Sequence, residues 1–253
     1  MSHHRSWPWP RVLAHRGAGF LAPENTLAAL RVGLEHGFHA VEFDAMAPHD
    51  DVPVLMHDET LARTTSGLGA VTEHRAEELV RLDAGRWHSP EFAGEPVPTL
   101  AQALDYCRAH AIWPNVEIKP ATGHEVRTGE LVARSVARAY ADVMHDDSGL
   151  PLLSSFSFDA LVAARDAVPG LPRALLIDAV PDGWQDLLQR CGAASLNTNH
   201  RGMTKERVQR IKAAGFWLFC YTVNEPARAR ELLEWGVDAF CTDRIDRIGP
   251  EFR

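Results

Sequence analysis

The sequence predicts an α/β fold, a single (β/α)8 TIM barrel with a small loop-rich insertion after the second strand. Short β-prone apolar runs alternate with amphipathic stretches in eight cycles, as in a parallel sheet covered by helices. The 253 residues match the length typical of such a barrel, and 45% hydrophobic content can fill one large core. A doubly wound open sheet is the alternative, but HRGAGF after the first strand is not a phosphate-binding GxGxxG pattern, and eight cycles favour closure.

Eight candidate strands run through the chain. Each is a short apolar, β-prone run next to turn or helix-capping residues. A further segment, Val52–Met56, follows the second strand and is expected to return beside it as a hairpin. In chain order the expected strands are Val12–His15, Ala40–Ala45, Trp113–Lys119, Leu152–Ser155, Ala174–Asp178, Ala194–Thr198, Trp217–Val223 and Ala239–Thr242.

Amphipathic stretches lie between most of these strands. Their apolar residues recur three or four apart, which is the spacing of one helix face. Asn25-Thr26 and Pro98-Thr99 are expected helix starts, and Gly192, Gly215 and Gly236 stand where helices should end. The expected apolar faces are Leu27, Leu30 and Leu34; Leu100, Leu104 and Cys107; Val132, Val136, Tyr140 and Val143; Trp184, Leu187, Leu188 and Cys191; Val208 and Ile211; and Ala229, Leu232 and Leu233.

The stretch between His57 and Pro98 breaks this rhythm. Its TTSGLGAV and WHSPEFAGEPVPTL segments are rich in Gly, Pro, Ser and Thr, which predicts mostly loop. Long connections in compact domains usually act as lids or pocket walls. We therefore expect one domain, residues 1–253, in which residues 58–98 form a lid-like insertion on the C-terminal rim, where barrel enzymes build their sites.

Charge and cysteine content narrow the function classes. The formal net charge of -8 is spread without acidic or basic runs, which argues against nucleic-acid or anionic-membrane binding and leaves small-molecule partners. No apolar run is long enough for a membrane span, and the start MSHHRSWPWP lacks the apolar core of a signal peptide. The four cysteines form no CxxC pair, so buried free thiols are expected. We expect a cytoplasmic protein without stable membrane insertion, although a chain whose leader had been removed would look the same.

Two carboxylates on the second strand are the first chemical feature. In AVEFDA (40–45), the two-residue period of a strand places Glu42 and Asp44 on one face. Like charges at this spacing repel, and burying them requires a compensating cation, most simply a divalent metal. The alternative is a carboxylate face in solvent, which this stretch alone favours.

Other ionisable residues follow at neighbouring strand ends. His15 and Arg16 end the first strand, and His57 ends the hairpin return. Glu117 and Lys119 stand two apart on the third strand and so face the same way. Ionisable groups pointing into a barrel are costly unless paired, so their clustering at one rim predicts a functional site.

At these residues the sequence resembles the glycerophosphodiester phosphodiesterase family, most closely its shorter bacterial, cytoplasmic-type members. HRG…PENT followed by ExD, HDxTLxRTT and ExK in this order is a specific signature. The resemblance runs nearly end to end. It is carried by AHRGAGFLAPENTLAAL (14–30), VEFDA (41–45), PVLMHDETLARTTSG (53–67), LDAGRW (82–87), FAGEPVPTL (92–100), NVEIKP (115–120), SSF (154–156), YTVN (221–224) and GVDAFCTDR (236–244).

The resemblance implies a (β/α)8 barrel and divalent-metal-dependent hydrolysis of glycerophosphodiesters to glycerol 3-phosphate and an alcohol. Three hard oxygen ligands without a thiolate suit Mg²⁺ or Ca²⁺, with Mn²⁺ as a further candidate, and argue against a structural zinc site. The site residues that the resemblance implies are the metal ligands Glu42, Asp44 and Glu117, the acid/base pair His15 and His57, and the phosphate-binding Arg16 and Lys119.

In this family one histidine is thought to deprotonate a glycerol hydroxyl, which attacks phosphorus, while the other protonates the leaving alcohol. Either His15 or His57 can start as the base. Two other classes stay open. A related lipid phosphodiesterase, of the lysophospholipase D or sphingomyelinase D type, would need an apolar groove, which the insertion could hide. A non-catalytic binding protein has less need to keep two histidines and three carboxylates together.

Three positions depart from the family's usual pattern. His88 replaces the aromatic residue after LDAGxW, Tyr221 replaces the tryptophan before TVN, and HDDV (49–52) displaces the turn glycine before PV. None is an expected metal ligand, but together they leave the preferred alcohol headgroup open. Capping, bracing or helix-starting roles are expected for Glu24, Asn25 and Asn224.

Overall fold

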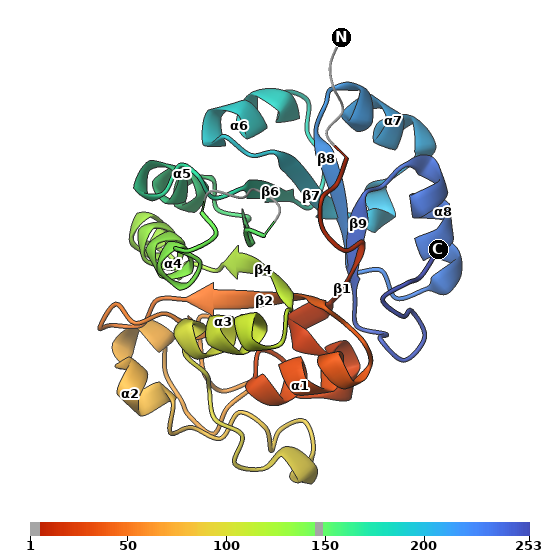
Figure 1. Cartoon of the computed structure of the whole chain (residues 1–253). Coiled ribbons are helices and arrows are strands. Elements are labelled where there is room, and N and C mark those ends of the chain that lie inside the picture. Colours follow the sequence, from red (N-terminus) through yellow and green to blue (C-terminus); the bar gives the residue numbers. More distant parts are fainter. Residues whose placement is uncertain (1–5, 145–148) are drawn as a thin grey trace.

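Eight parallel strands form a closed barrel in the computed structural model, which describes residues 6–144 and 149–253. Their order is β1-β9-β8-β7-β6-β5-β4-β2, and pairing of β1 with β2 closes the ring (Figure 1). The expected (β/α)8 barrel is therefore confirmed. The barrel strands are β1 (Val12–Ala14), β2 (Ala40–Met46), β4 (Trp113–Ile118), β5 (Leu152–Ser155), β6 (Arg173–Ile177), β7 (Ser195–Asn199), β8 (Trp217–Tyr221) and β9 (Ala239–Thr242).

The strand boundaries lie close to the predicted ones. Among the barrel strands the largest difference is in β8, which ends at Tyr221 rather than Val223, because the last residue of β7 that pairs with it is Asn199. The hairpin return is present as β3 (Val54–Leu55), which pairs antiparallel with the end of β2. This return places His57 beside the mouth of the barrel.

Helices lie between successive barrel strands, outside the ring (Figure 1). Thr26 and Thr99 cap two of them, as expected, and Gly192 and Gly236 end two others with positive φ. None of the described helices is long and apolar enough to cross a membrane. The helices are α1 (Leu27–Glu35), α2 (Ala76–Leu79), α3 (Leu100–Ala109), α4 (Glu125–Ala139), α5 (Phe158–Ala167), α6 (Trp184–Cys191), α7 (Lys205–Ala213) and α8 (Pro226–Trp235).

Two helix expectations needed correction. The sequence pattern does not predict the helix α5, because the face that this helix buries consists mainly of alanines, whose periodicity is weaker than that of leucine or valine. Ser157 caps it by accepting a hydrogen bond from the Ala160 amide. The helix α4 ends before Val143, since Tyr140 has already left helical geometry.

Residues 58–98 contain little regular structure, as their composition predicts. The short helix α2 and two 3₁₀ turns, Val71–Glu73 and Pro90–Phe92, are the helical segments among them. An apolar cluster that includes Leu61 and Leu79 packs the insertion against β2 and β3. The insertion is therefore anchored to the rim of the barrel.

Tryptophans fill the opposite, N-terminal end of the barrel. Trp113 and Trp217 are the first residues of β4 and β8. Trp9 stacks on Trp113 at 4.7 Å between ring centroids, and Trp7 meets Trp217 edge-on at 5.7 Å. Such aromatic pairs bury large apolar areas. This end is packed with side chains, so polar chemistry is left to the C-terminal mouth.

Candidate active site

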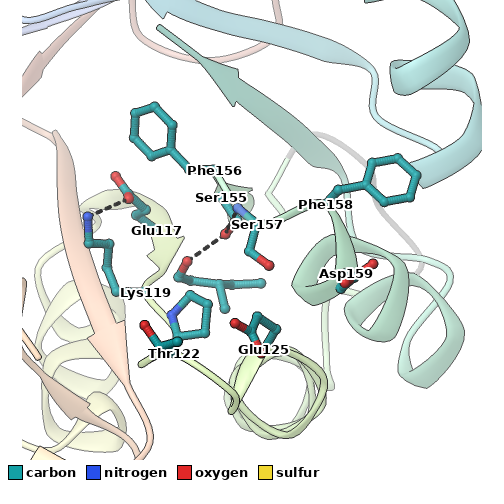
Figure 2. A pocket seen from close by; sticks show the side chains of 11 residues that line it. Glu117, Lys119, Thr122, Glu125, Ser155, Phe156, Ser157, Phe158 and Asp159 are labelled. Atoms are coloured by element: carbon teal, nitrogen blue, oxygen red, sulfur yellow. Dashed lines mark hydrogen bonds and ion pairs between the residues drawn. The ribbon is translucent and has the colours of Figure 1, made fainter.

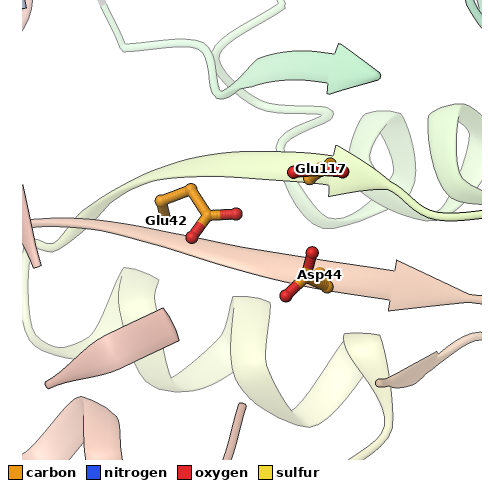
Figure 3. Close-up of side chains that lie close together, drawn as sticks. All are labelled: Glu42, Asp44 and Glu117. Carbon is orange, nitrogen blue, oxygen red and sulfur yellow. The ribbon is translucent and has the colours of Figure 1, made fainter. Parts of the chain in front are cut away.

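Three carboxylates from neighbouring strands meet at the mouth of the barrel. Glu42 and Asp44 lie two apart on β2, so both point inward, and Glu117 of β4 is the register partner of Asp44. One oxygen of each lies within 4.8 Å of the others (Figure 3). All three side chains are buried. The carboxylates thus face the interior, and the solvent-exposed alternative does not apply.

The electrostatics of this cluster favour a bound cation. Burial and the negative charge of Asp44 raise the pKa of Glu42 to about 7 and that of Glu117 to about 8. Burial also acts on Asp44, but nearby positive charges, that of Arg16 foremost, hold its pKa below the ordinary value. The positive charges near Glu42 and Glu117, among them Lys119 beside Glu117, therefore compensate their ionised forms only in part. Three hard oxygen donors without a thiolate fit a divalent cation of the Mg²⁺ or Ca²⁺ kind.

Asn25 fixes the position of Asp44. Its Nδ2 donates to Asp44 Oδ2 at 2.8 Å, and its Oδ1 accepts from the Asp44 backbone amide at 3.0 Å. Asn25 itself holds a left-handed backbone conformation, with φ of 59°, just before α1. These contacts match the bracing role expected for this residue.

His15 lies in a 3₁₀ turn directly after β1. Its Nδ1 is 2.5 Å from Asp243 Oδ1, and its Nε2 is 3.8 Å from Glu42 Oε2. Asn224 holds Asp243 in turn, because its Nδ2 donates to Asp243 Oδ2 at 2.9 Å. Burial alone would lower the pKa of His15, but Asp243 and Glu42 outweigh it and the pKa is raised. The ring is oriented with Nε2 toward the carboxylates.

His57 follows the hairpin return and has a parallel set of partners. Its Nδ1 is 2.6 Å from Asp58 Oδ1, and its Nε2 is 3.2 Å from Lys119 Nζ. Arg63 donates to the same aspartate. Burial lowers the pKa of His57, against the opposing charge of Asp44. Each imidazole therefore has an aspartate at Nδ1 and leaves Nε2 for other partners.

Two cations border the carboxylates. Arg16 Nη1 donates to Glu24 Oε1 at 2.7 Å, and its Nε is 3.5 Å from Asp44 Oδ2. Glu24 also accepts two hydrogen bonds from Arg63, each at 2.8 Å. Lys119 Nζ lies 3.2 Å from Glu117 Oε1. Both cations are thereby held beside the carboxylate cluster, where they can meet an anionic ligand.

A cavity of about 200 Å³ brings these groups together. Asp44 is not among the residues that line it, but one of its carboxylate oxygens lies within 4.8 Å of oxygens of Glu42 and Glu117. The remaining six expected site residues line it: His15, Arg16, Glu42, His57, Glu117 and Lys119.

Two larger cavities adjoin this one. A cavity of about 410 Å³ beside His15 is lined by Phe20 from the loop before α1 and by Trp87 and His88 from the insertion. Another, of about 450 Å³, lies beside Lys119 and is walled by Phe156 (Figure 2). Either offers room for a substituent that extends from a ligand at the centre.

The sequence alone did not identify the aspartates that hold the imidazoles. Asp58 is adjacent to His57, so a local signal existed. Asp243 is 228 residues from His15 and reaches it only because β9 pairs with β1 in the closed barrel. No local spacing could have indicated that contact.

Comparisons with known proteins show which family this chain resembles in sequence and in fold. The profile of the Glycerophosphoryl diester phosphodiesterase family matches residues 15–247. A glycerophosphodiester phosphodiesterase of Bacillus subtilis (strain 168) is 30% identical over 248 residues, which cover 93% of this chain and 84% of the relative. One from Caldanaerobacter subterraneus subsp. tengcongensis is 32% identical over 233 residues, covering 92% and 93%. The structure of an Oleispira antarctica phosphodiesterase in complex with the product sn-glycerol-3-phosphate matches with a TM-score of 0.84 at 34% identity and covers 94% of each chain.

Proposed function

This chain belongs to the glycerophosphoryl diester phosphodiesterase family, and on that premise we propose that it hydrolyses glycerophosphodiesters to glycerol 3-phosphate and an alcohol with one divalent cation and two histidines. The observation that carries the proposal is the central cavity, where two imidazoles and two cationic side chains adjoin three clustered carboxylates. The Oleispira relative, which is in complex with glycerol 3-phosphate as its product, supports the same product here.

Glu42, Asp44 and Glu117 would hold the cation, with Mg²⁺ or Ca²⁺ favoured and Mn²⁺ as a further candidate. Two observations support this assignment: one oxygen of each carboxylate lies within 4.8 Å of the others, and burial and the charge of Asp44 raise the pKa of Glu42 and Glu117 although positive groups lie nearby. When bound, the cation supplies positive charge that stabilises the negative charge building on the phosphoryl oxygens.

The protein's own side chains would do the remaining work. Arg16 and Lys119 bind non-bridging phosphate oxygens. One of His15 and His57 takes the proton of the glycerol hydroxyl next to the phosphoryl group, and that oxygen attacks phosphorus. The other gives its proton to the leaving alcohol oxygen as the P–O bond breaks. Water then opens the resulting cyclic phosphate, with the two roles exchanged.

The aspartates at the two Nδ1 atoms support the assignment of one histidine as base and the other as acid. A carboxylate that accepts from Nδ1–H fixes the tautomer in which Nε2 is free to take or give a proton. Asp243 would do this for His15 and Asp58 for His57. Both would be positioning residues, since neither needs to touch the substrate.

Release of glycerol 3-phosphate from a panel of diesters tests the proposal. The protein is assayed as purified, after EDTA treatment, and after add-back of Mg²⁺, Ca²⁺ or Mn²⁺. We expect turnover to disappear with EDTA and to return with at least one of the three ions. Turnover that survives complete metal removal contradicts the metal role, and no release from any diester contradicts the function.

The insertion would form a wall of the site on the side of the leaving alcohol. This wall is the reason for a second candidate function, that of a lipid phosphodiesterase. Phe20 is 61% exposed and Trp87 is 41% exposed, and both line the cavity beside His15. An apolar wall of this kind also suits a lysophospholipid or sphingolipid substrate. Faster turnover of lysophospholipid micelles than of glycerophosphodiesters in solution would favour that lipid phosphodiesterase.

The partner and location are part of the same proposal. We infer a small-molecule substrate and a place in the cytoplasm, which the four free, buried cysteines support, because thiols stay reduced there. Cell fractionation with an activity assay checks the location.

A further inference from the structure

The central cavity contains polar atoms that the mechanism above does not use. Asn115, Asn197 and Tyr221 also line it. Within residues 6–144 and 149–253, Asn115 Oδ1, Asn197 Nδ2 and the Tyr221 hydroxyl are buried without a hydrogen-bond partner. Unpaired buried polar groups destabilise a folded chain and are uncommon in proteins. Three of them in one cavity indicate that a ligand or water completes their hydrogen bonds.

The three side chains lie on both sides of the barrel. Asn115 precedes Glu117 by two residues on β4, so it points inward one layer deeper, next to Glu42 in the register. Asn197 of β7 and Tyr221 of β8 come from the part of the ring across from β2 and β4. The cavity therefore has polar groups on opposite walls, and Tyr221, the last residue of β8, lies nearer the mouth than Asn115 and Asn197.

A flip of the Asn197 side-chain amide that exchanges its oxygen and nitrogen does not give both of these polar atoms a hydrogen-bond partner. Ser195 Oγ donates to Asn197 Oδ1 at 2.8 Å, and both residues are fully buried. In the flipped orientation Nδ2 could donate to the serine hydroxyl, but the carbonyl oxygen would then lose its donor. One polar atom of this amide is left without a partner in either orientation.

Tyr221 offers a donor at the end of β8. Burial raises the pKa of Tyr221, and the negative charges of Asp178 and Glu117 act in the same direction, so the phenol stays protonated. Its ring packs edge-on against Phe156, with 5.7 Å between centroids. This contact restricts where the hydroxyl can point.

The chemistry of these atoms fits a hydroxyl group. Two donors and an acceptor match a group that both accepts and donates, whereas a phosphate offers only acceptors and suits the cations at the rim. The glycerol half of the substrate has one oxygen in the ester, a second that attacks phosphorus, and a third on the terminal carbon that the mechanism leaves without a role.

We propose that Asn115, Asn197 and Tyr221 bind the terminal hydroxyl of the glycerol half and make the enzyme selective for glycerol over shorter diols. This inference rests on the proposed function and states which half of the substrate the central cavity recognises. Selectivity follows because a diol that lacks this hydroxyl leaves the three groups without partners.

Two pairs of ligands test the inference, and the two members of each pair differ only in the terminal CH₂OH group. Glycerophosphocholine is compared with the choline diester of ethylene glycol phosphate, which keeps the attacking hydroxyl but lacks the terminal CH₂OH. Glycerol 3-phosphate and ethylene glycol phosphate are compared in the same way by calorimetric binding to the metal-loaded protein, which needs no turnover. In the wild type we expect the glycerol member of each pair to be favoured.

The test variants are Tyr221→Phe, which removes one oxygen, and Asn197→Leu, which keeps the approximate side-chain volume. We expect each to weaken binding of glycerol 3-phosphate by about 3- to 10-fold, the size of one lost hydrogen bond, and to leave ethylene glycol phosphate unchanged. The loss in turnover should appear mainly in KM. The matched control is Tyr140→Phe, because the Tyr140 hydroxyl is also buried and unpaired but lies outside the cavity, at the end of α4.

The inference is overturned if a variant loses the same affinity for both members of a pair. It is also overturned if folded Tyr221→Phe loses affinity for neither member. Both results indicate that the three groups bind water only. If Asn197→Leu does not fold, Tyr221→Phe decides alone. Failure of the proposed function looks different: the wild type then hydrolyses neither diester, while the calorimetric comparison still decides the inference.

Discussion

The site consists of side chains whose positions depend on specific partners as well as on the strands that carry them. Strand geometry directs Glu42 and Asp44 inward, but the double hydrogen bond with Asn25 fixes where the Asp44 oxygens lie. The imidazoles rely in the same way on Asp243 and Asp58. Substitutions at single residues should therefore separate metal binding from proton transfer.

Glu117→Gln should weaken metal binding, because the neutral amide removes one negative charge from the carboxylate cluster. We expect the affinity for Mg²⁺ or Ca²⁺ to fall at least about 10-fold in calorimetric titration. Glu125→Gln is the matched control, since Glu125 is in the first turn of α4 on the same side of the barrel but outside the carboxylate cluster. Equal affinities in the two variants would contradict the ligand role.

His57→Ala should remove one of the two proton-transfer groups. We expect kcat to fall by about 10²–10⁴, the usual contribution of a positioned acid or base, while the affinity for the metal stays close to that of the wild type. His110→Ala, at the exposed end of α3, serves as the control and should keep full turnover. Near-normal turnover of the His57 variant would show that the acid/base assignment is wrong.

At the scale of elements, the helix α1 supports the turn that carries His15 and Arg16. Gly33 of α1 lies against the backbone of that turn, since a Cβ at residue 33 would be 2.2 Å from the Gly17 carbonyl oxygen. A side chain there must push the turn away from the helix. The absence of a side chain at this helix position thus sets where two site residues lie.

Gly33→Ala should therefore reduce both stability and activity. Alanine has a higher helix propensity than glycine. The steric overlap of its Cβ with the backbone should outweigh that gain and lower the unfolding free energy by about 1–3 kcal/mol. The matched control is Gly129→Ala, whose Cβ would be 2.3 Å from the Ala160 carbonyl oxygen, between α4 and α5. Urea unfolding should show losses in both variants, and kcat/KM should fall only for Gly33→Ala. If Gly33→Ala kept the kcat/KM of the wild type, this would show that α1 does not position the turn that carries His15 and Arg16.

At the scale of the whole molecule, barrel closure concentrates negative charge in a buried space. The three carboxylates are at most 9% exposed, and the tryptophan-packed base leaves the mouth as the polar end. Such a cluster is destabilising unless a proton or a cation compensates it. Stability, pH and metal binding should therefore be coupled throughout the fold.

The metal-free protein should lose stability as pH rises from 6 to 9. Glu42 and Glu117 have pKa values of about 7 and about 8 in the folded chain, above the ordinary value of 4.5. The folded state therefore binds more protons than the unfolded state in this range, and the unfolding free energy falls as these protons leave. Bound metal replaces the protons and should add about 2.7 kcal/mol at 100 times its Kd.

Thermal unfolding at several pH values, with EDTA and with saturating Mg²⁺ or Ca²⁺, checks this coupling. We expect the melting temperature with EDTA to decline toward pH 9 and the decline to shrink with metal. Glu117→Gln should reduce the decline as well, since one of the two titrating groups is gone. A melting temperature that rises with pH in EDTA would contradict the burial of uncompensated carboxylates.

Much of the fold could be read from the sequence because it depends on local patterns. Strand and helix periods gave the eight cycles, and helix caps such as Thr99 and Gly236 gave their ends. The exception is α5, whose buried alanines leave only a weak period. The ordered ExD, HDxTLxRTT and ExK motifs indicated the family, which the comparisons confirm.

The amino-acid sequence was sufficient to predict the alternation of strands and helices, the shared face of Glu42 and Asp44, and the family. Each of these predictions depends on short patterns of residues close together in the chain or on the order of such patterns along it. Only the tertiary structure brought Asp243 to His15, across 228 residues, and placed the unpaired groups of Asn115, Asn197 and Tyr221 in one cavity. The reason is that barrel closure sets which strands face one another, and strand spacing along the chain does not encode which inward side chains then share a space.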